Sequence, residues 1–329
     1  MDRPDIETYI EGVLKRDRRR IAKAITLIES TLPAHQEMSR EILDRLIPYT
    51  GKAIRLGVTG LPGAGKSTFI ENFGTLLTEK GYRVAVLTVD PSSPKTGGSI
   101  LADKTRMEKL ATNDRAFIRP SPSGGTLGGV ARKTRETLFL CEAAGFDVVI
   151  VETVGVGQSE VTVASMVDFF LVLMIAGAGD ELQGIKKGVL ELADAIAVNK
   201  ADGDNVERTL MARRQYEVAF HLLNPASRSW TPPVLACSAL TGDGLGKIWD
   251  VVCDHRDIMT ASGEFEKKRR EQALDWMWFL VREGLADWFF GREAIVRLVP
   301  EMVRAIETGT MTPTSAASRM LAFLKNNPS

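Results

Sequence analysis

Apolar residues recur along this chain with two different spacings, which alternate through its central part. Runs that are apolar almost throughout predict buried strands, at 54–59, 83–90, 146–153, 169–175, 194–202 and 235–240. Segments with helical spacing lie between several of these runs, as at 68–73 and 130–144. The alternation predicts an α/β fold in which helices flank a mostly parallel central sheet.

The two ends of the chain lack the strand pattern. Residues 5–47 carry apolar side chains at helical spacing, with a break at Leu32-Pro33, and only helices are expected from Arg256 onward. We therefore expect an N-terminal helical extension at 1–50, a central α/β domain at 51–255 and a C-terminal helical arm at 256–329.

The C-terminal arm is rich in aromatic residues. Three of the five tryptophans of the chain, Trp276, Trp278 and Trp288, lie in it. A helix that is apolar almost all round must be buried on more than one side. The arm therefore docks on the central domain or forms a homodimer interface. We favour the homodimer, because large aromatic side chains dominate such interfaces.

The composition argues against several classes of protein. The 42 basic and 42 acidic residues cancel, so no overall field attracts nucleic acid or an acidic membrane. No apolar run reaches membrane-spanning length, and the acidic start at 1–7 is not typical of a signal peptide. The three cysteines are scattered, which suits a reducing compartment. We expect a cytoplasmic protein.

Two local clusters have a plain structural interpretation. The basic run at 15–20 is better explained as the exposed face of an amphipathic helix than as a phosphate-binding element. Cys253 and His255 lie close together on a helical stretch, and such a lone pair more often packs than binds a metal.

The segment after the first central strand fits the phosphate-loop pattern G-x-x-x-x-G-K-[ST]. Glycines let successive backbone N–H groups point at one anion, and the start of the following helix adds its dipole. Lys66 supplies a positive charge for the β- and γ-phosphates, and the Ser67 hydroxyl is the expected Mg²⁺ ligand. The expected nucleotide contacts are Gly60, Pro62, Gly63, Ala64, Gly65, Lys66, Ser67 and Thr68.

Carboxylates end two of the other predicted strands. Asp90 ends one strand, and Glu152 lies near the end of another in Glu152-Thr153-Val154-Gly155. A carboxylate opposite a phosphate loop can hold Mg²⁺ directly or through water, which gives Glu152 a catalytic role. Gly155 lets a backbone N–H approach the γ-phosphate where a side chain would obstruct it.

The strand at 194–202 ends in Asn199-Lys200-Ala201-Asp202, an N-K-x-D sequence. The Asp202 carboxylate can accept hydrogen bonds from the N1–H and N2–H₂ groups of guanine, and adenine offers no matching donors. Asn199 and Lys200 would brace the base and the phosphate loop, and Ser238-Ala239 follows the last strand. With the phosphate loop ahead of it, this order predicts a GTPase.

Gly-rich loops adjoin several of these strands and helices. The loop at 121–129 is either a mobile element that contacts nucleotide or partner, or a flexible connection. The segment at 176–188 follows a strand and carries charges of both signs, which is typical of a mobile loop near a ligand.

Four segments together resemble the MeaB/ArgK family of P-loop GTPases: 60–68, Asp90-Pro91-Ser92-Ser93, 152–160 and 199–202. The resemblance covers nearly the whole chain. It implies a P-loop G domain at 51–255, a homodimer joined by the C-terminal arm, and GTP and Mg²⁺ as cofactors. It also implies a chaperone that gates adenosylcobalamin loading into methylmalonyl-CoA mutase and protects or reactivates that enzyme.

The resemblance also implies roles for single residues. Asp90, Asp103 and Glu152 would surround Mg²⁺ together with Ser67, and the loop at 180–187 would sense the partner. Small GTPases place a water-orienting Gln directly after D-x-x-G, but here Val156 follows Gly155 and Gln158 comes later. We therefore predict slow intrinsic hydrolysis that accelerates when the partner positions Gln158 or Lys186.

Three other functions compete with this interpretation. A nickel-metallochaperone GTPase would need His or Cys ligands, which the chain lacks. A signal-recognition GTPase would bind RNA and membrane, and the zero net charge disfavours it. A P-loop kinase or transport ATPase is disfavoured by the N-K-x-D sequence, which selects guanine.

Overall fold

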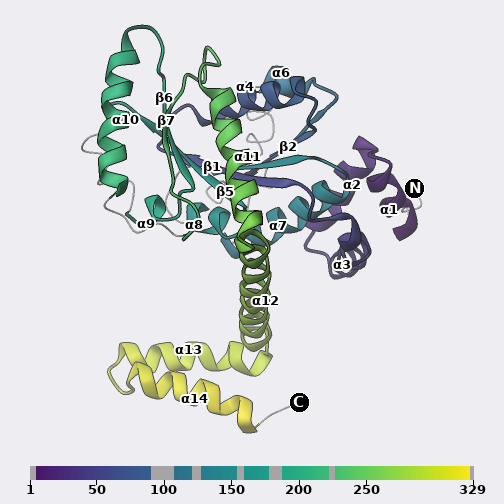
Figure 1. Cartoon of the computed structure of the whole chain (residues 1–329). Coiled ribbons are helices and arrows are strands. Elements are labelled where there is room, and N and C mark those ends of the chain that lie inside the picture. Colours follow the sequence, from purple (N-terminus) through teal and green to yellow (C-terminus); the bar gives the residue numbers. More distant parts are fainter. Residues whose placement is uncertain are drawn as a thin grey trace. The chain divides into compact units, whose positions relative to one another are not determined.

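The structure is a computed structural model, which describes residues 5–89, 107–120, 127–153, 159–177, 187–221 and 227–326. Contacts divide the chain into two compact units, 1–269 and 270–329. Figure 1 shows the order of the elements. The functional domain bounds expected from the sequence stay a prediction.

The first unit is built on a sheet of seven parallel strands in the order β3-β2-β4-β1-β5-β6-β7. The prediction of an α/β fold with a parallel sheet is therefore confirmed. The strands are β1 (Ile54–Gly60), β2 (Val84–Val89), β3 (Ala116–Arg119), β4 (Val148–Thr153), β5 (Phe169–Ile175), β6 (Ala195–Asn199) and β7 (Val234–Ala236).

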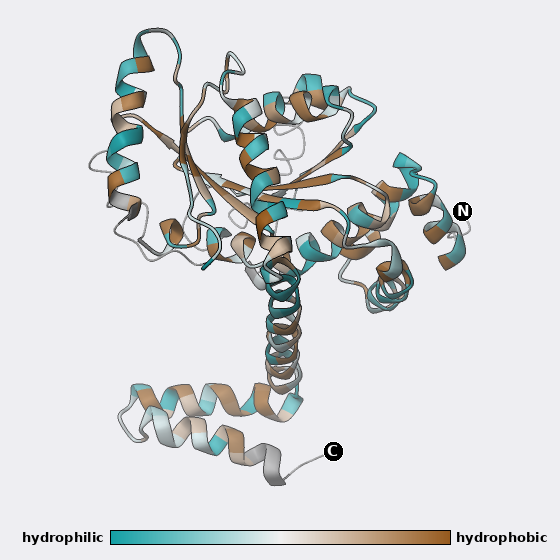
Figure 2. Ribbon diagram, in the orientation of Figure 1, coloured by the Kyte–Doolittle hydropathy of each residue, from teal (hydrophilic) through white to brown (hydrophobic). Residues whose placement is uncertain are grey.

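Strand β1 lies in the middle of this order and pairs with β4 on one side and β5 on the other. Gly57 is opposite Val151 and also opposite Phe170. All seven residues of β1 are buried, including the polar Arg55 and Thr59, whose side chains have hydrogen-bond partners in α7 and β4. Figure 2 shows the hydrophobic residues concentrated on the strands and on one side of the helices around them.

Helices connect the strands, as parallel pairing requires. The connecting helices are α4 (Lys66–Glu79), α6 (Glu108–Ala111), α7 (Leu127–Ala143), α8 (Ser159–Ala164), α9 (Lys187–Leu190) and α10 (Val206–His221), with the 3₁₀ turn η3 (Gly203–Asn205) before α10. Helix α11 (Leu245–Ala261) follows β7 and packs Ile248, Trp249 and Val252 into the main core beside Phe73.

The N-terminal residues form three helices, α1 (Ile6–Leu14), α2 (Arg18–Glu29) and α3 (Pro33–Leu46), followed by the 3₁₀ turn η1 (Ile47–Tyr49). Asp5 and Asp17 cap α1 and α2, which stabilises each helix start. Pro33 begins α3, at the break that the sequence predicts. The three helices share a buried cluster with α7 that includes Ile25, Ile42 and Leu140.

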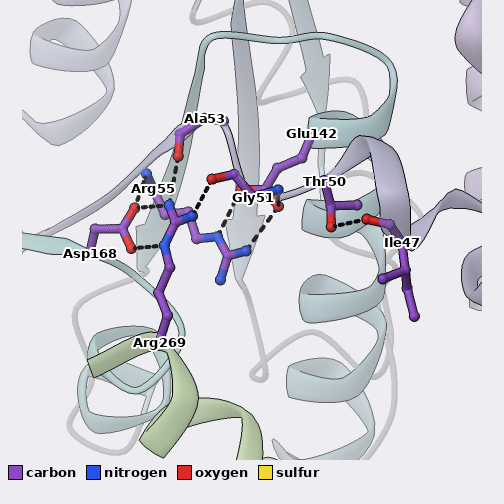
Figure 3. Close-up of polar contacts among 8 residues, drawn as sticks. All are labelled: Ile47, Thr50, Gly51, Ala53, Arg55, Glu142, Asp168 and Arg269. Atoms are coloured by element: carbon purple, nitrogen blue, oxygen red, sulfur yellow. Dashed lines mark hydrogen bonds and ion pairs between the residues drawn. The ribbon is translucent and has the colours of Figure 1, made fainter. Parts of the chain in front are cut away.

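A buried ionic network lies at the amino-terminal ends of β1 and β5 (Figure 3). Arg55 in β1 donates two hydrogen bonds to Glu142 of α7, at 2.9 and 2.8 Å. Arg269, at the start of helix α12 (Glu264–Phe290), donates to both carboxylate oxygens of Asp168, at 2.8 and 2.6 Å. These contacts fix the edge of the sheet opposite the strand ends that carry the sequence motifs.

The second unit contains the rest of α12 together with α13 (Glu293–Glu307) and α14 (Pro313–Asn326). Helices α13 and α14 contact each other, and the buried apolar side chains of this unit are Ile295, Met302 and Ala316. In the part of the chain that the structure describes, no helix combines the length and the apolar content that a membrane crossing needs.

Candidate nucleotide-binding site

The phosphate loop joins β1 to α4 at the carboxyl edge of the sheet. Gly60 has φ 151° and Gly65 has φ 86°, a region that favours glycine. A Cβ atom at Gly60 would lie 2.3 Å from the carbonyl oxygen of Leu173, and one at Gly65 would lie 2.8 Å from Nδ2 of Asn199. Both glycines are therefore required by the close approach of β5 and β6 to the loop.

Lys66 is the first residue of α4, and its side chain folds back over the loop. Its Nζ atom donates to the carbonyl oxygens of Gly60, at 2.8 Å, and Leu61, at 3.2 Å. Burial lowers the pKa of Lys66, while the carboxylates of Glu152 and Glu160 act in the opposite direction. The ammonium group is thus held where the phosphates of a nucleotide would lie against the loop.

Ser67 and Glu152 face each other across the site. The Ser67 hydroxyl donates to Oε1 of Glu152 at 3.2 Å. Thr153, the next residue of β4, donates to the hydroxyl of Thr59 at 2.7 Å and so joins the ends of β4 and β1. A hydroxyl beside a carboxylate next to a phosphate loop is a donor set that suits Mg²⁺.

Several predicted residues cannot be placed by the structure. Asp90, Asp103, Gly155, Gln158 and Lys186 lie outside the described residues. In the described ranges no group of three or more His, Cys, Asp and Glu side chains could hold a metal ion. Pro62, Gly63 and Thr68 belong to the exposed rim of the phosphate loop and the first turn of α4.

Asn199, at the end of β6, joins the phosphate loop to the segment after β7. Its Nδ2 atom donates to the carbonyl oxygen of Ala64 at 2.7 Å, and its Oδ1 atom accepts from the backbone N–H of Ala239 at 2.8 Å. The Cys237 thiol lies 3.7 Å from the same Oδ1, and burial raises the pKa of Cys237 to about 12. The thiol is therefore protonated and can donate.

Asp202 and Ser238 meet beside this junction. The Ser238 hydroxyl donates to Oδ2 of Asp202, which holds the carboxylate in place. Lys200 has φ 66°, one of two positive values among the non-glycine residues that the structure describes. Asn205 supports this strained residue by donating to its carbonyl oxygen at 2.8 Å. The structure thus brings the N-K-x-D and Ser238-Ala239 segments together, as the sequence predicts.

Two residues that contact members of this site were not assigned a role from the sequence. Glu160, in α8, is buried and acts on the charge of Lys66. Asn72, in α4, donates from Nδ2 to the carbonyl oxygen of Ala239 at 2.7 Å. Glu160 lies in the segment 152–160 that carries the family resemblance, but its effect on Lys66 depends on the fold, and Asn72 belongs to no motif.

Comparison with known proteins gives consistent matches. The family model described as methylmalonyl-CoA mutase-associated GTPase MeaB matches residues 21–294. A putative GTPase of Caulobacter vibrioides is 56% identical over 97% of both chains, and GTPase ArgK of Escherichia coli is 50% identical over 96% of both. A crystal structure described as LAO/AO transport system kinase matches with a TM-score of 0.80 and 42% identity over 99% of both chains.

The parallel sheet, the phosphate loop and the matches to named GTPases define a P-loop GTPase, which binds GTP. The family model covers most of the chain. The chain belongs to the MeaB family of methylmalonyl-CoA mutase-associated GTPases, so the resemblance carried by its sequence motifs is confirmed.

Proposed function

We propose that this chain is a cytoplasmic, Mg²⁺-dependent GTPase chaperone of the adenosylcobalamin-dependent methylmalonyl-CoA mutase. In this proposal it gates adenosylcobalamin loading into the mutase and protects or reactivates that enzyme. The observation that carries the proposal is the match of residues 21–294 to a family described by its association with methylmalonyl-CoA mutase.

The described residues support the binding of GTP at this site. Lys66 would neutralise charge on the β- and γ-phosphates, and Asp202 would accept hydrogen bonds from guanine. Ser67 and Glu152, which lie 3.2 Å apart, would hold Mg²⁺, with Asp90 and Asp103 as further ligands. When bound, Mg²⁺ would neutralise charge that develops on the phosphate oxygens.

We propose that hydrolysis by the protein alone is slow. The residue directly after Gly155 is Val156, which cannot orient a water molecule by hydrogen bonding. Gln158 and Lys186 are the candidates for orienting the water and stabilising the leaving charge. A partner that positions either side chain would accelerate the reaction, and the loop at 180–187 is the proposed sensor of that partner.

The first test is GTP turnover by the purified chain at increasing concentrations of methylmalonyl-CoA mutase. We expect a slow basal rate that rises about tenfold or more and reaches a plateau near one mutase per chaperone, because one correctly placed charged or water-orienting group is worth at least that factor. Serum albumin at equal concentrations is the matched control. A rate that does not respond to the mutase would remove the proposed partner and leave the GTPase activity intact.

We also propose that the chain forms a homodimer through α12. Beyond Arg269 this helix carries apolar side chains at alternating spacings of four and three residues, which is the pattern of a coiled-coil seam. These residues are Leu274, Trp278, Val281, Leu285 and Trp288, and their exposed fractions run from 42% for Val281 to 59% for Leu285. A second copy offers an identical seam, which satisfies two-fold symmetry.

Leu285→Lys tests this interface. A charge within the seam leaves an ammonium group buried against apolar side chains, which is costly. We expect light scattering to give twice the chain mass of 36.0 kDa for the wild type and a single chain mass for Leu285→Lys. Ala286→Lys adds the same charge beside the seam and should remain dimeric. A wild type that is monomeric at micromolar concentration would contradict the proposal.

A further inference from the structure

Asn72 occupies a position where its residue type is unfavourable for local structure. It lies in the middle of α4, and asparagine is a poor residue for a helix interior because its amide competes for backbone hydrogen bonds. Its side chain is partly buried and does not bond within the helix. Instead, Nδ2 donates to the carbonyl oxygen of Ala239, which is 167 residues away in the sequence, at 2.7 Å.

The backbone of Ala239, whose carbonyl oxygen accepts this hydrogen bond, is held on both sides of its Cα atom. The N–H group of Ala239 donates to Oδ1 of Asn199 at 2.8 Å, while its carbonyl oxygen accepts from Asn72. Ala239 itself is 3% exposed, so water cannot easily replace either partner. Two side-chain amides from different elements therefore fix one residue of the loop after β7.

The same loop positions the group that would read guanine. Ser238, which precedes Ala239, donates its hydroxyl hydrogen to Asp202, and its backbone N–H donates to the carbonyl oxygen of Asp243 at 2.9 Å. Ser238 is fully buried, so a displacement of Ala239 would move Ser238 and disturb the hydrogen bond to Asp202. Asn72 thus acts on the base site through the loop.

Asn72 also connects this loop to the phosphate site, because Asn72 and the phosphate-binding residues Lys66 and Ser67 lie on the same helix, α4. Helix α4 begins with Lys66 and Ser67, and Asn72 lies about 9 Å further along its axis. A second connection runs from the phosphate loop through Asn199, whose Nδ2 donates to Ala64. The base and phosphate subsites are therefore joined by two separate routes, and Asn72 is part of the one that passes through the helix.

We propose that Asn72 is a positioning residue for guanine recognition, which fixes the Ser238-Ala239 loop to α4 and thereby sets the lifetime and the base selectivity of the bound nucleotide. Asn72 touches neither the reacting atoms nor, in this proposal, the nucleotide. The proposal rests on the GTPase activity of the family and not on the mutase partnership, so failure of one is distinguishable from failure of the other.

The experiment measures the release of a fluorescent GDP from the full-length chain after addition of excess unlabelled GDP. Asn72→Ala removes the donor, and Asn72→Asp keeps the size of the side chain but cannot donate to the Ala239 carbonyl. We expect both variants to release GDP about three to ten times faster, which is the effect of one lost hydrogen bond when the route through Asn199 remains. The preference for GDP over ADP should fall, while kcat at saturating GTP changes less than twofold.

Asn113→Ala is the matched control. Asn113 donates from Nδ2 to the hydroxyl of Thr78 at 3.0 Å, so it contacts the same helix near its other end. We expect this variant to lower the melting temperature without changing GDP release or base preference. The proposal is overturned if Asn72→Ala releases GDP within twofold of the wild-type rate, or if Asn113→Ala accelerates release equally, since that would indicate a general loosening of α4.

Discussion

Lys66→Ala lowers kcat/KM for GTP by about 10²–10³-fold, the factor typical of removing one preorganised charged donor from an active site. The structure explains why the loss should be large. The Nζ atom is held over the phosphate loop by the carbonyl oxygens of Gly60 and Leu61, so the charge needs little reorganisation when phosphate arrives. Steady-state phosphate release with GTP as substrate measures the effect.

The same variant should fold normally. Burial lowers the pKa of Lys66, which means that burying the charged ammonium group destabilises the folded state relative to the unfolded state. This cost is fully present below the folded-state pKa and disappears as the pH rises through the unfolded value near 10.4. At neutral pH we therefore expect Lys66→Ala to match or exceed the melting temperature of the wild type without nucleotide, and to lose the rise in melting temperature that GDP causes.

Lys247→Ala is the control for this prediction. Lys247 follows a glycine at the start of α11, as Lys66 follows one at the start of α4, but its side chain is exposed and α11 follows β7 and not the phosphate loop. Its turnover and its response to GDP should equal those of the wild type. A Lys66→Ala protein with turnover within tenfold of wild type would show that the ammonium group is not part of the catalytic site.

Asp168→Ala lowers the free energy of unfolding by about 3–5 kcal/mol, the cost of leaving one buried charge without its partner. Asp168 is 2% exposed, and its carboxylate accepts from Nε and Nη2 of Arg269 and from the backbone N–H of Arg55 at 2.8 Å. Arg269 cannot easily turn to solvent, because it also donates to the carbonyl oxygens of Gly51 and Ala53 (Figure 3).

Urea unfolding, followed by tryptophan fluorescence, measures the loss. Asp168→Asn retains an acceptor for the Arg55 N–H but not the charge, so its midpoint should lie between those of Asp168→Ala and the wild type. Asp257→Ala is the control, because Asp257 is exposed and its ion pair with Arg256 is solvated. An Asp168→Ala midpoint equal to that of Asp257→Ala would show that the buried pair contributes nothing to stability.

Much of the nucleotide site is local in sequence and could therefore be predicted. The phosphate loop uses consecutive backbone N–H groups and the first side chains of the next helix, so 60–68 contains its whole chemistry. The N-K-x-D segment is equally compact. In contrast, the hydrogen bond from Asn72 to Ala239 spans 167 residues, and that from Arg269 to Asp168 spans 101, without a pattern at either end.

The strands of the sheet also divide into those that the sequence predicts and one that only the structure shows. The buried strands β1, β2, β4, β5 and β6 were predictable because each lies in an apolar run. Strand β3 was missed, because its four residues lie at the edge of the sheet and are too few to show a period. The apolar pattern of a single strand does not specify which other strands pair with it, so the strand order came only from the structure.

By itself, the sequence determined the α/β class, the GTPase motifs and the family, because each is a property of contiguous residues. Tertiary structure alone decided that Asn199 and Asn72 both hold Ala239, that Glu160 acts on Lys66, and that Asp168 pairs with Arg269. These contacts depend on how parallel strands and their helices pack. Packing brings together side chains that are distant in sequence. Each such contact stabilises the protein only after the chain between its two residues has folded and brought them together.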